Sequence, residues 1–384
     1  MVKKANKTKK TTNVVERAYE QAVETLRKCS TRHGLFASGG PRGYKGVWSR
    51  DSFITFLGAS LVDKDSKDGE LFRKTFQRSL DILGKNQSRK GQIPNAVHNF
   101  NRKKPVIDYG SIDSTLWYMI GQYLYEKRYR DSSLLRAHKK KMERAMTWLS
   151  YQDFGENIML EQLPTTDWQD AFPQRYGRTI NTQALYYKVL NLVGEKAKSR
   201  KLRSLVNRVK ETRLWGGDYY YAYRWKNHNK YKEIGDWFDS LGNLLAIVFG
   251  LSGRSISEKI VDHIQRKRIH RPYPIKAIYP PIREKSEYWE DYYKDCDAGK
   301  PYHYLNGGIW TYIGGFYVLA LIKTGQHDKA RQELRLLAEA NLRGKPFPEW
   351  INPLTKKTHG MHQAWNAGMY ILAYESLKKG RALL

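Results

Sequence analysis

Helical periodicity recurs along almost the whole sequence, and a long polar loop interrupts it at every second junction. Apolar residues three or four positions apart, as at Ala18, Ala22, Leu26 and Cys29, predict about twelve helices between Val15 and Leu377. Such alternation predicts helical hairpins arranged in a ring, with functional groups on the loops at one end. An α-solenoid would show a fixed short repeat and shorter loops, which this sequence lacks.

The predicted elements follow from the same periodicity. Residues 1–12 are expected to form a disordered basic tail, and residues 13–384 a single all-α domain. Alternating tyrosines predict a small β-hairpin near 216–231. The clearest helices are expected at about 15–29, 53–62, 69–84, 116–125, 132–150, 180–194, 237–251, 255–266, 307–323, 330–341 and 363–377.

The composition narrows the class of protein. The chain has 384 residues, a net charge of +30, 11 Trp and 27 Tyr. A strongly basic chain can bind nucleic acid, but no nucleic-acid-binding motif is found, so this partner is not favoured. The aromatic residues suit a carbohydrate cleft, because a sugar ring stacks on them, although many must fill the core.

Other signals point to a cytoplasmic protein without a cofactor. Two cysteines, Cys29 and Cys296, make no disulfide framework, and the polar N-terminus has no signal-peptide core. No stretch is apolar enough to cross a membrane. His359 and His362 stand three residues apart but have no third ligand nearby, so no metal site is predicted.

The stretch from Thr165 to Phe172 is the strongest candidate for chemistry. Asp167 and Asp170 flank Trp168 and an amide, and a carboxyl group held against an aromatic ring has its pKa raised. That is what a general acid near neutral pH requires. A second carboxyl group, Glu349, precedes Trp350 far downstream. Either acid alone is more simply a helix cap or a solvated loop residue, whereas the pair is the equipment that cleaves a glycosidic bond.

Several motifs together resemble the six-hairpin glycosidases, whose fold is an (α/α)6 barrel. The resemblance covers nearly the whole chain and is closest to the amylo-α-1,6-glucosidase type and the neutral invertases. The motifs that carry it are Val47-Trp48-Ser49-Arg50-Asp51-Ser52, Gly91-Gln92-Ile93-Pro94-Asn95, Ser111-Ile112-Asp113-Ser114-Thr115-Leu116-Trp117, Trp168-Gln169-Asp170-Ala171, Pro348-Glu349-Trp350-Ile351-Asn352-Pro353 and Gln363-Ala364-Trp365-Asn366-Ala367-Gly368.

The resemblance implies roles for these residues. Asp170 matches the general acid, with Asp167 as a competitor, and Glu349 matches the catalytic base. The residues expected to bind the sugar are Trp48, Arg50, Asp51, Asp113, Trp168, Gln183, Trp310, Gln363 and Trp365. Core packing explains Trp310 and Trp365 equally well. Where family members often have His-Asn-Gly-Gly, this chain has Tyr304-Leu305-Asn306-Gly307-Gly308, with His303 close by.

The implied activity is hydrolysis of an α-glucosidic bond in a disaccharide or oligosaccharide with inversion, which requires carboxyl groups roughly 6.5–9.5 Å apart. A separation of about 5 Å would instead indicate a retaining route through a covalent intermediate, and the sequence does not decide between the two. An α-1,6-glucoside, sucrose and trehalose all remain possible substrates. The alternatives of another class are a catalytically inactive basic scaffold that binds nucleic acid and a lectin-like sugar binder. The paired carboxylates argue against the lectin, because binding alone does not need a second acid across the sugar.

Overall fold

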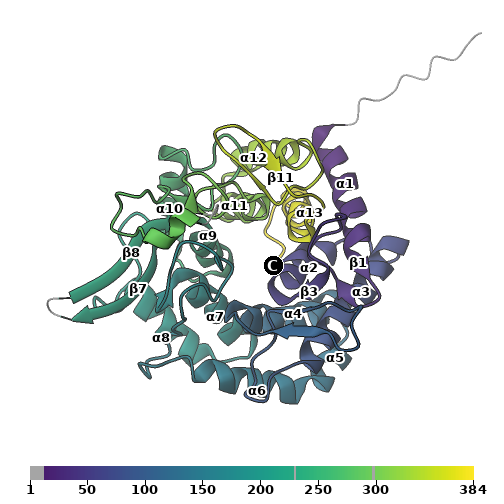
Figure 1. The fold of residues 1–384 in the computed structure, drawn as a ribbon, viewed down its shortest axis with the longest axis horizontal. Helices are drawn as coiled ribbons and strands as arrows, with labels where there is room; N and C mark the ends of the chain where they lie inside the picture. Colours follow the sequence, from purple (N-terminus) through teal and green to yellow (C-terminus); the bar gives the residue numbers. More distant parts are fainter. Residues whose placement is uncertain (1–12, 229–230, 296–298) are drawn as a thin grey trace, which may run out of the picture.

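Six inner helices form the wall of a closed ring in the computed structural model, which describes residues 13–228, 231–295 and 299–384 (Figure 1). Each inner helix packs against the next, and the last packs against the first. The inner helices are α2 (Ser49–Ala59), α4 (Asp113–Tyr129), α7 (Ile180–Leu192), α9 (Ser240–Phe249), α11 (Thr311–Lys323) and α13 (Ala364–Lys378).

An outer layer of helices covers this wall, with one outer helix before each inner helix in the sequence and two, α5 and α6, before α7. The outer helices are α1 (Val14–Cys29), α3 (Lys67–Lys85), α5 (Ser133–Ala137), α6 (Lys139–Ser150), α8 (Lys196–Asn207), α10 (Arg254–Arg266) and α12 (His327–Asn341). The pairs form the six hairpins of an (α/α)6 barrel, which confirms the predicted fold class. The helix predicted over 132–150 is interrupted at His138, so it appears as α5 and α6.

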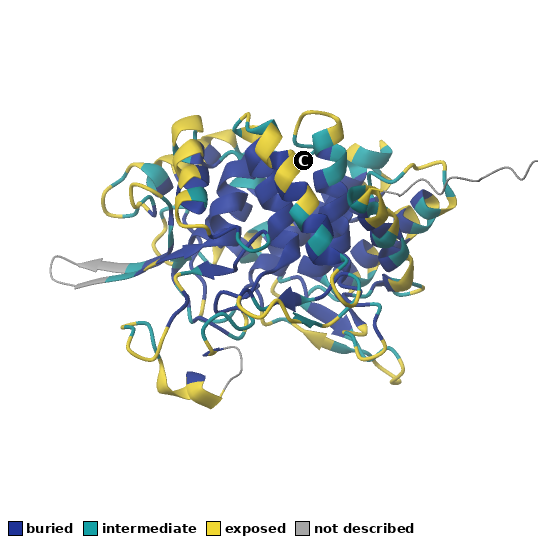
Figure 2. Cartoon of the chain, turned by 90° about the horizontal axis from the view of Figure 1, so that it is seen from above, coloured by how far each residue is buried: buried dark blue, intermediate teal, exposed yellow. Residues whose placement is uncertain are grey.

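Inner and outer helices differ in how apolar residues are distributed around them. Every residue of α11 from Thr311 to Ile322 is buried, because neighbours surround this helix on all sides. Helix α10 buries only one stripe, which includes Ile260, Val261 and Ile264. This pattern, apolar all round or apolar on one face, assigns each helix to its layer (Figure 2).

The ring closes where α2 meets α13, and two glycines permit the close approach. A Cβ atom at Gly58 of α2 would overlap the carbonyl oxygen of Gly368 in α13. A Cβ atom at Gly368 would in turn overlap the backbone of Thr55. Larger residues at either position would therefore push the first and last inner helices apart.

Short antiparallel strands lie in the loops that precede the inner helices and gather at one end of the ring (Figure 2). The pairs are β1 (Ser30–Thr31) with β2 (Gly34–Leu35) and β10 (Trp350–Ile351) with β11 (Thr358–His359). A three-stranded sheet joins β3 (Gly46–Trp48), β4 (Ala96–His98) and β5 (Val106–Asp108). A four-stranded sheet joins β6 (Arg178–Thr179), β7 (Tyr221–His228), β8 (Tyr231–Asp239) and β9 (Ile278–Tyr279).

Several predicted boundaries are wrong, among them the start of the helix expected at 307, since α11 begins at Thr311. The hairpin was expected over 216–231 with a helix from Trp237, but β8 continues to Asp239 and α9 starts only at Ser240. Trp237 contacts Tyr223 of β7 with ring centroids 5.5 Å apart, and aromatic pairs of this kind stabilise a sheet. Helix α2 begins four residues earlier than predicted, at Ser49.

The early start of α2 changes the setting of several site residues. Arg50 and Asp51 were expected on a loop but lie in the first turn of α2. Asp113 likewise opens α4. The predicted basic tail, residues 1–12, lies outside the described residues. None of the helices in the described ranges is both long enough and apolar enough to cross a bilayer.

Candidate active site

A pocket of about 260 Å³ lies at the end of the ring where the inner helices begin. Four of the loops that precede inner helices contribute to it, together with the first turns of α2 and α13. The residues that line it are Ala37, Tyr44, Trp48, Arg50, Asp51, Trp168, Asp170, Tyr304, Trp310, Glu349, Gln363 and Trp365.

Asp170 lies in the irregular loop before α7, and its side chain is 53% exposed to the open pocket. Its one described ion pair is with Arg50, whose Nη2 atom lies 3.6 Å from Oδ2 of Asp170. The surrounding protein limits hydration and raises the pKa of Asp170, while the positive charge of Arg50 opposes the rise. A raised pKa favours the protonated form that a general acid needs.

Arg50 is held in place by Asp113. Nη1 of Arg50 donates to both carboxylate oxygens of Asp113, at 3.0 and 3.1 Å. Ser111 donates a further hydrogen bond to Asp113. Asp113 is fully buried and is not among the residues that line the pocket. The carboxylate instead fixes the guanidinium that faces the pocket.

Asp51 follows Arg50 in α2 and does line the pocket. Burial raises the pKa of its carboxyl group to about 7, against the opposing charge of Arg50. A carboxyl group of this kind can accept or donate a hydrogen bond to a sugar hydroxyl near neutral pH.

Asp167 is in a different setting from Asp170, although only three residues separate them. It is fully buried and forms an ion pair with Arg175, whose Nη2 atom lies 2.8 Å from Oδ2. Arg175 also pairs with Asp239, the residue before α9. Gln162 and the backbone N–H of Gln169 donate further hydrogen bonds to Asp167 at 2.9 and 3.0 Å. Asp167 does not line the pocket, so the geometry favours Asp170 as the acid.

Glu349 lies on the loop before α13, and two tyrosine hydroxyls hold it. Tyr44 and Tyr304 both donate to Oε1 of Glu349, at 3.1 and 3.3 Å. Burial raises the pKa of Glu349, while these two hydrogen bonds stabilise the charged form and oppose the rise. The two bonds also fix the direction of the carboxylate.

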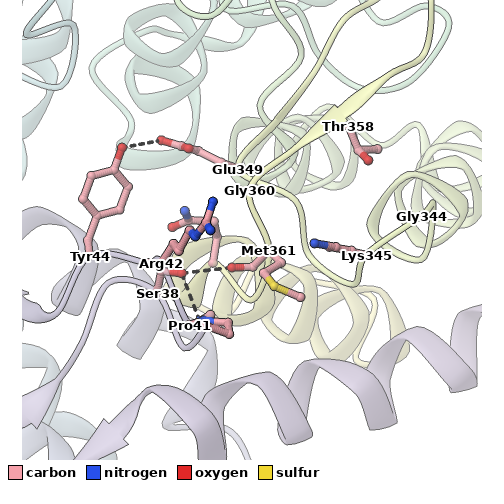
Figure 3. A pocket seen from close by; sticks show the side chains of 13 residues that line it. Ser38, Pro41, Arg42, Tyr44, Gly344, Lys345, Glu349, Thr358, Gly360 and Met361 are labelled. Atoms are coloured by element: carbon pink, nitrogen blue, oxygen red, sulfur yellow. Dashed lines mark hydrogen bonds between the residues drawn. The ribbon is translucent and has the colours of Figure 1, made fainter.

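A second cavity of about 700 Å³ adjoins the pocket at Glu349 (Figure 3). Tyr44, Glu349 and Gln363 line both spaces, whereas Asp170 lines only the smaller one. Arg42 and Lys345 lie on the wall of the larger cavity. Glu349 is therefore open to solvent from a side that Asp170 does not share.

The tryptophans form one connected aromatic wall. Trp168 meets Trp310 edge to face at 5.9 Å, and Trp310 meets Trp365 in the same way at 5.8 Å. Tyr312 stacks on Trp365 at 4.2 Å. Trp310 and Trp365 thus pack into the ring and also line the pocket, while their contact with a sugar remains a prediction.

Most of the predicted site residues meet at this pocket. Three of them do not line it: Asp113, Asp167 and Gln183. Gln183 is buried on α7 and exchanges hydrogen bonds with the backbone of Leu160. The sequence analysis missed Tyr44 and Tyr304. Tyr304 belongs to the Tyr304–Gly308 motif, so its position in this motif could have suggested a role at the site. Tyr44 lies in a Gly-rich stretch in which no motif marks it.

The histidines near the site have structural partners. His359 stacks on Trp350 with ring centroids 4.0 Å apart, and Nδ1 of His362 lies 3.2 Å from the hydroxyl of Thr25. His303 meets the edge of Trp350. Across the described ranges, no group of three or more His, Cys, Asp or Glu side chains is arranged to hold a metal ion.

Solved structures share this architecture. The GH63 mannosylglycerate hydrolase from Thermus thermophilus, solved in complex with Tris and D-glycerate, aligns with a TM-score of 0.68 at 13% identity, over 93% of this chain and 100% of that one. A structure described as a wild-type glycosidase aligns with a TM-score of 0.64 at 15% identity, over 95% and 97%. The chain has the (α/α)6 barrel fold of the six-hairpin glycosidases.

The sequence comparison is more specific but covers less of the chain. The family described as alkaline and neutral invertase matches residues 235–379, a region that contains Glu349 but not Asp170. Neutral/alkaline invertase 1, mitochondrial, from Oryza sativa subsp. japonica is 31% identical over 140 residues, 35% of this chain and 22% of that protein. Probable alkaline/neutral invertase D from Arabidopsis thaliana is 31% identical over 144 residues, 36% and 26%. The matched region is thus about a quarter of each relative.

Proposed function

We propose that this protein is a glycoside hydrolase that cleaves an α-glucosidic bond with inversion. The observation that carries the proposal is that Asp170 and Glu349, from distant parts of the chain, line one small pocket with Arg50 and Asp51. The likeness to glycosidases in fold and to invertases in sequence supports the same class.

In the proposed reaction, Asp170 donates its proton to the glycosidic oxygen as the bond to the anomeric carbon breaks. Glu349 accepts a proton from a water molecule whose oxygen attacks the anomeric carbon from the opposite face. The raised pKa of Asp170 favours its protonated form, which can donate the proton. The hydrogen bonds from Tyr44 and Tyr304 favour the ionised form of Glu349. The larger cavity beside Glu349 gives water a route to the base.

Arg50 and Asp51 are proposed to position the sugar, and Trp48, Trp310 and Trp365 to offer it stacking surfaces. The pocket volume of about 260 Å³ is below the range of about 300–1,000 Å³ typical of drug-sized ligands. A pocket of this size suits one monosaccharide ring, with the leaving group outside it.

Sucrose is the first substrate to test, because the matched family and relatives are named invertases. An α-1,6-linked glucoside and trehalose are the other candidates. The decisive experiment is a hydrolysis panel of sucrose, isomaltose and trehalose in which NMR identifies the anomer released first. From sucrose, release of β-glucose supports inversion at the glucosyl carbon and release of α-glucose contradicts it, whereas trehalose cleaved with inversion gives one β- and one α-glucose. No hydrolysis of any α-glucoside contradicts the proposed function.

We also propose that residues 13–384 form one catalytic domain, because α13 packs against both α1 and α2 at the other end of the described chain. Cys29 is buried and its pKa is raised by burial to about 12, so a reactive thiol is not expected there. A cytoplasmic setting remains our proposal, and one relative is named cytosolic invertase 1. An inactive scaffold is not favoured, because two carboxyl groups facing one pocket are unnecessary for it.

A further inference from the structure

The loop that carries Asp170 is anchored on both sides of this residue. On the N-terminal side, Trp168 packs against Trp310 and Tyr312 of the barrel wall. On the C-terminal side, Phe172 is fully buried, and its ring meets the ring of Tyr293 edge to face at 4.5 Å. Between these anchors, the carboxyl group of Asp170 forms a 3.6 Å ion pair with Arg50.

Tyr293 belongs to a short 3-10 helix, η1 (Asp291–Asp295), in the long segment before α11. Besides packing on Phe172, its hydroxyl oxygen accepts a hydrogen bond from the backbone N–H of Gln174 at 3.1 Å. The side-chain amide of Gln174 donates to the neighbouring Tyr292. The 3-10 helix therefore holds both the side chain and the backbone of the residues that follow Asp170.

A second hydrophobic core, separate from the barrel core, supports Tyr293. We call it the acid-side core, and it consists of Phe172, Ala222, Tyr223, Trp237, Ile278, Ile282 and Tyr293. Trp237 of the hairpin meets Tyr288 at 4.9 Å, and Trp289 meets Tyr293 at 5.4 Å. Because Tyr288 and Trp289 are adjacent in the sequence, these aromatic contacts connect the inserted hairpin with Tyr293, and through Tyr293 with Phe172. This arrangement gives the hairpin and the 3-10 helix a shared contact with the loop of the acid.

We propose that Tyr293 is a positioning residue for the general acid, which acts through Phe172 and Gln174 and lets Asp170 reach the glycosidic oxygen. The inference rests on the proposed function. None of the residues that line the cavity beside Glu349 belongs to the acid-side core, although Tyr304, which donates to Glu349, packs against that core. Tyr293 itself packs on the residues that follow Asp170. Proton donation should then depend on Tyr293 more strongly than water activation does.

The test compares two substrates with the same glycosyl group. A disaccharide needs its leaving oxygen protonated, whereas a glycosyl fluoride leaves with little help from an acid. Tyr293→Ala is expected to lower kcat for the disaccharide about 10²-fold, since small displacements of catalytic groups have effects of this size. Its kcat for the fluoride should change less than about threefold. Asp170→Asn serves as the reference for the difference in kcat loss between the disaccharide and the fluoride. Tyr293→Phe keeps the aromatic ring and should retain most of the activity on the disaccharide.

Tyr19→Ala is the matched control, because Tyr19 packs on Tyr374 at 4.7 Å and does not line the pocket. It should affect both substrates equally or not at all. Hydrogen exchange of residues 168–174 gives a readout independent of turnover and should be faster in Tyr293→Ala than in the unmodified protein. Equal loss on both substrates, or unchanged exchange, overturns the role of Tyr293.

Failure of the proposed function would look different. If Asp170→Asn shows no difference between the two substrates, the assignment of the acid is wrong, whatever Tyr293 does. If the unmodified protein cleaves neither compound, both proposals are overturned, and any change in exchange then reports packing alone.

Discussion

The two carboxyl groups proposed to act on the substrate are held in contrasting ways. Glu349 is fixed directly, because two tyrosine hydroxyls donate to one of its oxygens. Asp170 is fixed indirectly, through the packing of Trp168 and Phe172 on either side of it. The difference matches the two tasks. A base must stay ionised, and hydrogen bonds stabilise its charge, whereas an acid that stays protonated gains from an environment that does not solvate its charge.

The largest effects should come from removing either carboxyl group. Asp170→Asn and Glu349→Gln should each lower kcat for the disaccharide by about 10²–10⁴-fold, because each removes one proton transfer. Steady-state kinetics would measure this, with circular dichroism to show that the fold is retained. Normal turnover in both variants would contradict the site assignment.

Asp167→Asn tests whether Asp167 stabilises the fold rather than acting as the general acid. It leaves the buried Arg175 with only Asp239 as a charged partner, so we expect a loss of about 3 kcal/mol in the free energy of unfolding. Urea denaturation would measure it. The fall of activity at high pH, which reports ionisation of the general acid, should persist in this variant because Asp170 is unchanged. Full stability combined with complete loss of proton donation would instead identify Asp167 as the acid.

Removing the tyrosine hydroxyls should have a smaller effect on the base. Tyr44→Phe and Tyr304→Phe should each lower kcat/KM about tenfold, since a hydrogen bond to a charged group contributes about 1.5–3 kcal/mol. Each hydroxyl opposes the rise in the pKa of Glu349, so its loss raises that pKa further. The acid limb of the profile should therefore move to higher pH.

The control for these variants is Tyr151→Phe, because Tyr151 is 71% exposed and outside the pocket. Its profile should match that of the unmodified protein. A movement of the acid limb to lower pH in Tyr44→Phe would contradict the proposed role of the hydroxyl.

The last prediction concerns the pH dependence of the unmodified protein, where we expect only a shift of the profile. Activity should fall as the pH drops through the pKa of Glu349, because the base is then protonated. It should also fall as the pH rises through the pKa of Asp170, because the acid is then ionised. Both pKa values are raised by burial, so both limbs should lie above the value of about 4 usual for free carboxyl groups. Initial rates between pH 4 and 9 would test this.

Periodicity and motif order predicted the ring and most of the pocket, because those features depend on residues close together in the sequence. The choice between Asp167 and Asp170 could not be made, because a loop has no period that tells which side chain faces inward. Arg175 and Asp239, which bury Asp167, come from separate segments. Tyr44 was missed for the same reason: its partner Glu349 is 305 residues away. The sugar contact expected for Asp113 also depended on a tertiary detail, its ion pair with Arg50.

The meeting of Gly58 and Gly368 has a consequence for biosynthesis. Glu349, Gln363 and Trp365 emerge from the ribosome long after Arg50 and Asp51, and all of them line the same pocket. Docking of α13 onto α2 therefore completes the wall and the pocket in one late, long-range step, of the kind that folds slowly. A nascent chain that lacks α13 would have no assembled site, so substrate could be processed only after α13 has been synthesised and has docked.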